Sequence, residues 1–254
     1  MLYDINGNKL NDTFGDICNV KEIGKKIIDG TIKTISLIGD SITDGGAGTG
    51  YNGSASTALS TNTAGYCWAN MLKAYLYQKY GTEVTNYGQY GSDISTQLGK
   101  LDTTVPAGTD LVIWLTGTNN RGTAITSLTA YGNTLKYGID TIKARADHLI
   151  VMSGIPATES NEDAHSFSMA EIADVIIPAV TDADCKFIPM YNLFNEWLRD
   201  NGLVETVNDY FDGYGIHPND AGYHIMLQII LRELGVPVPF YEDLTVAGDY
   251  YPFT

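Results

Sequence analysis

Hydrophobic positions alternate between two patterns along the chain after residue 30. Short apolar runs rich in β-branched residues predict buried strands, and longer segments with apolar residues at helical spacing predict helices. The predicted strands are residues 33–39, 83–88, 110–117, 148–155 and 186–191. The predicted helices are residues 65–80, 126–146, 168–183, 192–200 and a last one within 217–235. Strands that alternate with helices predict a parallel sheet covered on both faces, in one three-layer α/β/α domain.

The two ends of the chain depart from this alternation. We expect residues 1–30 to form an extension to a domain of residues 31–254, with a helix and a hairpin. The hairpin is predicted to turn at Asn6-Gly7, because both central residues of such a turn favour positive φ. Residues 236–254 are aromatic and interrupted by proline, which predicts an extended strap packed on the domain.

Composition restricts the partners of the protein. The net charge of −15 argues against nucleic acid, whose binding depends on clustered Lys and Arg side chains. No apolar run approaches the roughly 20 residues that span a bilayer, so no membrane span is expected. The N-terminus lacks the basic start and apolar stretch of a secretion signal, which predicts a cytoplasmic protein or one exported by another route.

Metal and cofactor sites are not expected. The three cysteines are widely spaced, without a Cys-x-x-Cys pair, and predict free thiols. His148, His165 and His224 lack a cluster of carboxylate or cysteine neighbours and are expected to be structural. Residues 48–53 match Gly-x-Gly-x-x-Gly but do not lead into a helix, so no dinucleotide site is predicted.

Polar residues and glycines follow the predicted strands at the edge where open parallel sheets bind ligands. Ser41 follows the first strand, Gly91 the second and Asn119 the third, and His217 precedes the last helix. Taken singly, they can be explained as a helix cap, a turn glycine, an Asx turn and a helix entry. Together they supply a hydroxyl nucleophile, a base and oxyanion donors, which an ester hydrolase needs along with an acid to orient the base.

Four motifs resemble the four blocks of the SGNH (GDSL-type) hydrolases, in the same order. They are GDSIT at 39–43, NYGQYGSD at 86–93, GTNN at 117–120 and HPNDAGY at 217–223. The resemblance covers residues 33–235. It implies an esterase with a flavodoxin-like three-layer α/β/α sandwich and agrees with the five-stranded parallel sheet predicted from the apolar runs.

The resemblance also implies a role for each matching residue. Ser41 matches the nucleophile, and its backbone N–H is one donor to the oxyanion. Gly91 matches the second backbone donor, and Asn119 matches the side-chain donor. His217 matches the general base, while Asp40, beside the nucleophile, is expected to brace the turn.

Two positions depart from the family's pattern. Asn120 replaces the Asp that usually ends the third block, which alters a supporting hydrogen bond, and it is a candidate for substrate binding. Tyr214 stands three residues before His217, where the family has its triad Asp. Asp212 is the candidate acid, because the glycines between it and His217 can let the loop bulge. The alternative is a Ser-His dyad whose base is oriented by a backbone carbonyl.

Loops at the active edge predict the substrate class. Residues 45–65 and 156–166 are polar, and we expect them to form walls of the site. Tyr51, Tyr87 and Tyr90 can offer aromatic faces there, and Tyr51 and Tyr90 are candidates for substrate binding. Such a surface favours a short acyl group, such as acetyl on a carbohydrate, over a long-chain lipid.

These residues predict a metal-independent serine esterase that acts through an acyl-enzyme on a small-molecule or glycan ester. Two other functions fit the same residues. One is a glycan-binding or structural module with an impaired site, and the other is an acyltransferase with a sugar acceptor. The Ser, Gly, Asn and His at the matching positions argue against an impaired site.

Overall fold

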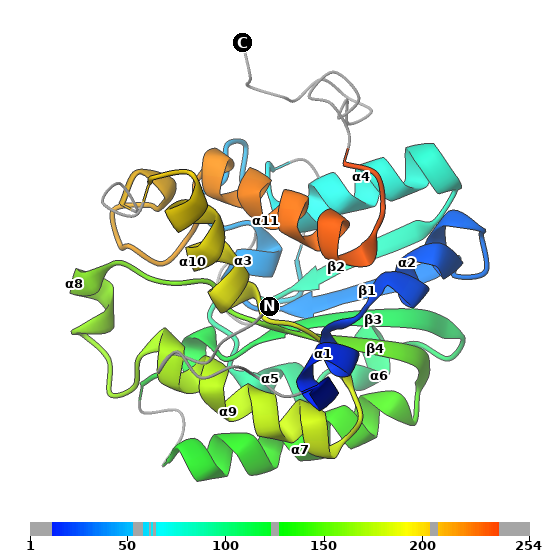
Figure 1. Ribbon diagram of the computed structural model, residues 1–254, viewed down its shortest axis with the longest axis horizontal. Helices are drawn as coiled ribbons and strands as arrows, with labels where there is room; N and C mark the ends of the chain where they lie inside the picture. Colours follow the sequence, from blue (N-terminus) through cyan, green and yellow to red (C-terminus); the bar gives the residue numbers. More distant parts are fainter. Residues whose placement is uncertain are drawn as a thin grey trace.

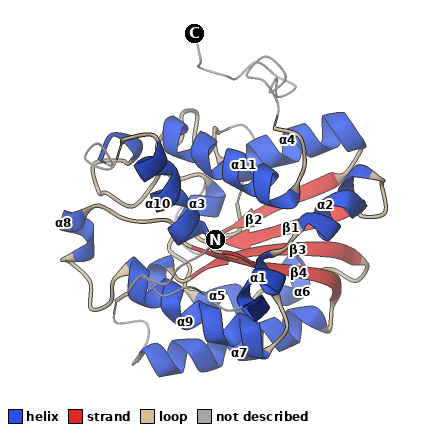
Figure 2. Ribbon diagram, viewed as in Figure 1, coloured by secondary structure: helices blue, strands red, loops and turns tan. Residues whose placement is uncertain are grey.

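The computed structural model describes residues 12–52, 58–60, 62, 65–122, 127–203 and 208–238. Its centre is a sheet of five parallel strands in the order β2-β1-β3-β4-β5 (Figures 1 and 2). The strands are β1 (Thr34–Gly39), β2 (Glu83–Gly88), β3 (Thr109–Thr116), β4 (Ala146–Ser153) and β5 (Lys186–Ile188). The strand order reverses at β1, and ligands of open parallel sheets bind beside such a point.

Helices cover both faces of this sheet (Figure 1). One face packs against α2 (Lys21–Ile28), α4 (Trp68–Tyr80), α10 (Met190–Asp200) and α11 (Asp220–Leu234). The other packs against α1 (Asp12–Cys18), α5 (Ile94–Leu98), α6 (Leu101–Thr104), α7 (Leu128–Lys143) and α9 (Met169–Asp182). Three short elements follow strands directly or closely: α3 (Ser41–Asp44), the 3₁₀ helix η1 (Thr118–Asn120) and α8 (Glu159–Glu162). The predicted three-layer α/β/α sandwich is confirmed.

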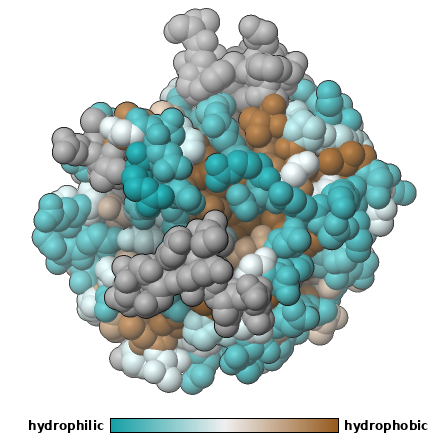
Figure 3. Space-filling model, in the orientation of Figure 1, coloured by the Kyte–Doolittle hydropathy of each residue, from teal (hydrophilic) through white to brown (hydrophobic). Residues whose placement is uncertain are grey.

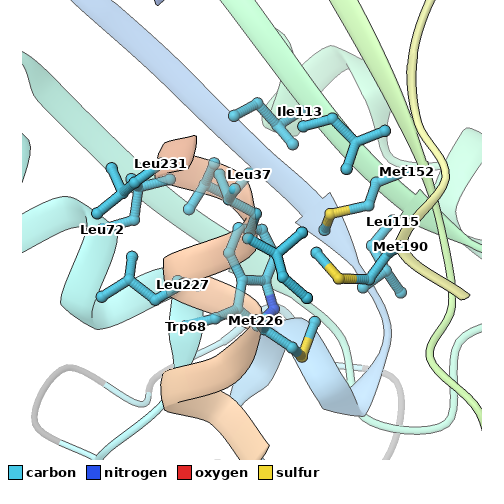
Figure 4. Close-up of a cluster of buried hydrophobic side chains, with 14 of the residues drawn as sticks. Leu37, Trp68, Leu72, Ile113, Leu115, Met152, Met190, Met226, Leu227 and Leu231 are labelled. Carbon is cyan, nitrogen blue, oxygen red and sulfur yellow. The ribbon is translucent and has the colours of Figure 1, made fainter. Parts of the chain in front are cut away.

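Successive residues of each strand pack into opposite helical layers. In β3, Ile113 and Leu115 belong to the core shared with α4 and α11, whereas Val112 and Trp114 belong to the core shared with α7 and α9. Figure 4 shows the first of these cores, where Leu37 of β1 lies among side chains of α4 and α11. Both faces of β3 are therefore buried, which explains its long apolar run, whereas the edge strand β2 alternates between buried and more exposed residues.

The first four strands agree with their predicted boundaries, whereas the fifth strand and the helices predicted over 65–80 and 126–146 each differ by three residues at one end. β1 to β4 lie within two residues of their predicted bounds, but the strand predicted over 186–191 ends at Ile188. Pro189 ends it, because proline has no N–H to donate to a neighbouring strand, and α10 begins directly afterwards. The last helix begins after its N-cap, Asn219, and is followed by Gly235, whose φ of 66° favours glycine.

The extension at the N-terminus packs on the sandwich through its helices. α1 contacts β5 and α9, and α2 contacts α11. The hairpin expected at Asn6-Gly7 and all but the first three residues of the strap expected over 236–254 lie outside the described residues. None of the helices in the described ranges is long and apolar enough to cross a membrane.

The three thiols are free and sheltered from solvent. Cys67 and Cys185 are buried, and Cys18 is half-buried. Burial raises the pKa of each thiol to about 12, so all three are protonated at neutral pH. A protonated thiol is a poor nucleophile, which leaves hydroxyl groups as the candidates for chemistry.

Candidate active site

The candidate nucleophile lies where β1 meets α3. Asp40 caps α3 by accepting a hydrogen bond from Ile42 N at 2.9 Å, and Ser41 is the first residue of the helix. Gly88, at the end of β2, gives this turn its space, because a Cβ there would lie 2.2 Å from Asp44 N. A central strand therefore presents Ser41 on a rigid support.

His217 reaches Ser41 from 176 residues along the chain. Its Nε2 lies 2.9 Å from Ser41 Oγ, and its Nδ1 lies 2.8 Å from Asp212 Oδ2. A hydroxyl, an imidazole and a carboxylate in this order allow the imidazole to take the hydroxyl proton while the carboxylate fixes its orientation. The structure brings together all three candidate catalytic side chains.

A tight turn returns Asp212 to the imidazole. Asp212 N donates to His217 O at 2.8 Å, and Gly215 N donates to Asp212 O at 2.9 Å. The φ of Gly215 is 74°, which favours glycine. Asp212 Oδ1 accepts hydrogen bonds of 3.2 to 3.4 Å from the N–H groups of Tyr214, Ile216 and His217. Among the described residues, the partner of His217 Nδ1 is the Asp212 carboxylate and not a backbone carbonyl.

The candidate oxyanion donors are tied together at the same edge of the sheet. Gly91 lies in the turn after β2 with a φ of 70°. Asn119 Nδ2 donates to Ser92 O at 2.9 Å, which fixes the amide beside that turn and leaves its second hydrogen available. Ser92 Oγ donates to Gly39 O at 3.2 Å, next to the nucleophile. The backbone N–H groups of Ser41 and Gly91 form no hydrogen bond within the described part of the chain.

Two polar side chains beneath the site are fully buried. Asn120 Oδ1 accepts from Ile94 N at 3.1 Å, and the side chain has no exposed surface. A side chain without exposed surface does not touch a substrate, so Asn120 supports the loop instead of binding substrate as expected. Burial raises the pKa of the Asp40 carboxyl to about 6, although the hydrogen bond from Ile42 N acts in the opposite direction.

Aromatic side chains flank the imidazole. The Tyr90 and His217 rings lie 5.5 Å apart at 33°, and Tyr90 is 36% exposed, so it can also contact a bound ligand. Gly46 lies against the same ring, because a Cβ there would come within 3.1 Å of His217 Cδ2. The Tyr51 hydroxyl donates to Asp44 Oδ2 at 2.6 Å, which orients the half-buried Tyr51 ring in the loop after the nucleophile.

One basic residue at the site was not predicted from the sequence. Arg121 follows the GTNN motif directly, and its side chain is only 1% exposed. Its guanidinium donates to Thr118 O, to Asn161 Oδ1 and to Glu162 Oε2, so it connects η1 with α8. The only signal in the sequence was the position of this charged residue directly after the GTNN motif.

The remaining histidines lie apart from the candidate triad and have local contacts. His148 contacts Lys26, His224 contacts Gln228, and His165 contacts a backbone carbonyl. Within the described ranges, no three His, Cys, Asp or Glu side chains are grouped as metal ligands. The candidate site therefore consists of the residues around Ser41 and His217.

The model of the GDSL-like lipase/acylhydrolase family matches residues 37–225, which include every candidate catalytic residue. The chain belongs to this family. This GDSL hydrolase is therefore a carboxylic ester hydrolase. Curated protein sequences give no match to it.

Solved structures similar to this GDSL hydrolase share its fold. An acetylxylan esterase from Geobacillus stearothermophilus is 21% identical with a TM-score of 0.64, over 81% of this chain and 95% of the other. An α/β-hydrolase enzyme from the metagenome of Lake Arreo, Spain, is 20% identical with a TM-score of 0.64, over 80% of this chain and 95% of the other.

Proposed function

We propose that this GDSL hydrolase is a serine esterase that removes short acyl groups through an acyl-enzyme, with an acetylated carbohydrate as substrate. The observation that carries the proposal is the line of contacts from Ser41 Oγ through His217 to Asp212. Each contact is within hydrogen-bond reach, as nucleophilic catalysis by serine requires.

In the first half-reaction, Ser41 Oγ attacks the carbonyl carbon of the ester and gives its proton to His217 Nε2. Asp212 stabilises the imidazolium that results. The carbonyl oxygen becomes an oxyanion, which accepts hydrogen bonds from Ser41 N, Gly91 N and Asn119 Nδ2. The alcohol then leaves with the proton from His217, and the acyl group remains on Ser41.

In the second half-reaction, His217 takes a proton from water, and the water oxygen attacks the acyl carbon. The same donors stabilise the second oxyanion. Collapse of this intermediate releases the carboxylic acid, and His217 returns the proton to Ser41 Oγ. The cycle uses only groups that the chain supplies.

The surroundings of Ser41 support a short acyl group on a polar alcohol. Tyr90 offers an exposed aromatic face beside His217, and aromatic faces with polar tips suit sugar rings. The net charge of −15 favours neutral alcohols over anionic ones. The acetylxylan esterase that shares the fold fits this substrate class.

A fluorophosphonate probe and 4-nitrophenyl acetate test the mechanism. Ser41→Ala is expected to abolish labelling and to lower kcat by on the order of 10⁴-fold or more. Ser95→Ala is the control, because Ser95 is an exposed serine on α5. Labelling or turnover that survives in Ser41→Ala would disprove the proposed nucleophile.

Substrate choice is tested separately with esters of increasing chain length and with acetylated xylo-oligosaccharides. We expect kcat/KM to fall from acetate to octanoate esters, and acetate release from the oligosaccharides to require Ser41. An equal or higher rate with octanoate would contradict the proposed substrate. Transfer of acetyl to added sugar in preference to water would identify the chain as an acyltransferase.

A further inference from the structure

The turn from Asp212 to His217 is held from inside by the Asp212 carboxylate, but the carbonyl oxygens of Tyr214 and Gly215 at its tip accept no hydrogen bond from within the turn. Tyr214 is 80% exposed at this tip. The turn lies between Phe211 and Pro218, which pair with each other as an isolated antiparallel β-bridge. The proposed triad needs this turn in one conformation, because Asp212 lies five residues before its imidazole. Hydrogen bonds to these two carbonyl oxygens therefore have to come from another segment.

The segment around α8 provides them. Asn161 Nδ2 donates to Tyr214 O at 2.9 Å, and Thr158 N donates to Gly215 O at 2.9 Å. The Thr158 side chain packs directly against the backbone of Gly215, because a Cβ on Gly215 would lie 1.9 Å from Thr158 Oγ1. The α8 segment thus holds both carbonyl oxygens at the tip of the turn.

Helix α8 cannot be positioned by the hydrophobic core. It has four residues, none of them is buried, and its N-cap, Thr158, makes no side-chain capping bond. Arg121 positions it instead, with Nη2 donating to Asn161 Oδ1 at 2.7 Å and Nη1 to Glu162 Oε2 at 3.0 Å. The Arg121 Nε donates to Thr118 O at 3.1 Å, close to the candidate oxyanion donor Asn119.

Arg121 is an unusual residue for this position on electrostatic grounds. It is the one Lys or Arg side chain that is buried in the described part of this acidic chain. Burying a guanidinium is costly unless its donors are paired, and Asn161, Glu162 and Thr118 pair them. A planar fork matches two acceptors at once, which a lysine ammonium does not.

We propose that Arg121 is a positioning residue for ester hydrolysis, acting through Asn161 to hold the turn that carries Asp212 and His217 against Ser41. The proposal rests on the proposed function. Asn161 is the link, because its Oδ1 accepts from Arg121 while its Nδ2 donates to Tyr214 O. One buried guanidinium thereby couples the loop of the oxyanion donors to the loop of the base and acid.

Asn161→Asp tests the link with the smallest change. The variant keeps an acceptor for Arg121 but places a carboxylate oxygen against Tyr214 O, where Nδ2 now donates. We expect kcat for 4-nitrophenyl acetate to fall about 10- to 100-fold, with KM within about twofold of wild type, because a small misplacement of catalytic groups is costly. The rate of fluorophosphonate labelling should fall by the same factor.

Arg121→Lys tests the guanidinium, and Arg145→Gln is the matched control. Arg145 forms an exposed pair with Asp102, so its loss removes one positive charge without touching the α8 segment. We expect Arg121→Lys to reduce kcat as Asn161→Asp does. The kcat of the double variant should be no lower than that of the less active single variant. Such non-additivity is expected of residues that act through one contact.

The outcomes separate the positioning role from the proposed function. Wild-type kcat in Asn161→Asp would overturn the positioning role, and so would a raised KM with unchanged kcat. If Arg121→Lys does not fold, as judged by circular dichroism, Asn161→Asp decides alone. If wild-type turnover does not depend on Ser41, the proposed function fails first, whatever the Asn161 variant does.

Discussion

Asp212 lies five residues before His217, where the family has its acid three residues before, and its carboxylate still contacts the imidazole. Its Oδ1 is held by three backbone N–H groups, and its Oδ2 contacts His217. The carboxylate therefore fixes both the turn and the imidazole. Tyr214, which occupies the usual position of the acid, has 80% of its surface exposed.

We expect Asp212→Asn to lower kcat for 4-nitrophenyl acetate by about 10²- to 10⁴-fold with little change in KM. An amide neither stabilises the imidazolium nor fixes the tautomer that leaves Nε2 free to accept a proton. Asp209→Asn, an exposed change three residues earlier, is the control. Full activity in Asp212→Asn would mean that another group orients His217.

Asp40 makes stability depend on pH in an uncommon direction. Burial raises the pKa of its carboxyl from 3.8 to about 6, so between these values the folded chain binds more protons at Asp40 than the unfolded chain. Its contribution to the free energy of unfolding therefore falls as pH rises from about 4 to about 6, and stays low above that.

Asp40→Asn should remove this dependence, because an amide can keep the capping bond to Ile42 N without a buried charge. We expect the variant to gain up to about 3 kcal/mol relative to wild type at pH 7.5, and much less at pH 4.5. Urea unfolding of both proteins at the two pH values measures the difference. A difference that is the same at both would contradict the assignment.

Single residues differed in how well the sequence predicted them. Ser41 and His217 were predicted because they lie in motifs that resemble those of a known family. Asp212 was predicted because the glycines between it and His217 can let the loop bulge. Arg121 and the burial of Asn120 were not predicted, since both depend on how a loop packs after folding. Local sequence carries no record of such long-range contacts.

At the scale of elements, α9 begins with a capping box. Ser168 Oγ accepts from Glu171 N at 3.1 Å, and Glu171 Oε2 accepts from Ser168 N at 2.8 Å. The first turn of the helix thus has two backbone donors satisfied by side chains. This cap stabilises an element that covers the sheet without touching the candidate triad.

We expect Ser168→Ala to lower the free energy of unfolding by about 1 kcal/mol, because the Glu171 N–H loses its acceptor. The value of kcat should not change. Ser168→Thr retains a hydroxyl and is the control in urea unfolding. Equal stability of the alanine and threonine variants would show that the cap contributes nothing.

Helices and strands were predicted well where burial requires a long run or repeat of apolar residues, and poorly where the element is too short to show one. The strands β1, β3 and β4 have apolar residues on both faces, so their runs are distinct. Helices α5, α6 and α8 have four or five residues, too few for a helical period to be recognised. The end of β5 was misplaced because the backbone effect of Pro189 outweighs the apolar run around it.

At the scale of the whole molecule, the fold class determines where the candidate site lies. Hydrophilic residues dominate the described surface in the view of Figure 3, as the net charge of −15 leads one to expect. The candidate site lies at the carboxyl end of the sheet, where β1 is central and the strand order reverses. The fold class predicted from the alternation of strands and helices specifies this edge, although not the contacts within it.

The separation of the candidate nucleophile and base along the chain limits when the enzyme can become active during folding. Ser41 and His217 are 176 residues apart, and His217 is placed by the turn that leads into α11. Closing so long a loop carries a large entropic cost and is slow compared with helix formation. In refolding from urea, we expect esterase activity to return with or after the change in tryptophan fluorescence. Activity that returned earlier would contradict this order. On the proposed mechanism, a growing chain cannot hydrolyse esters until His217 has been synthesised and docked.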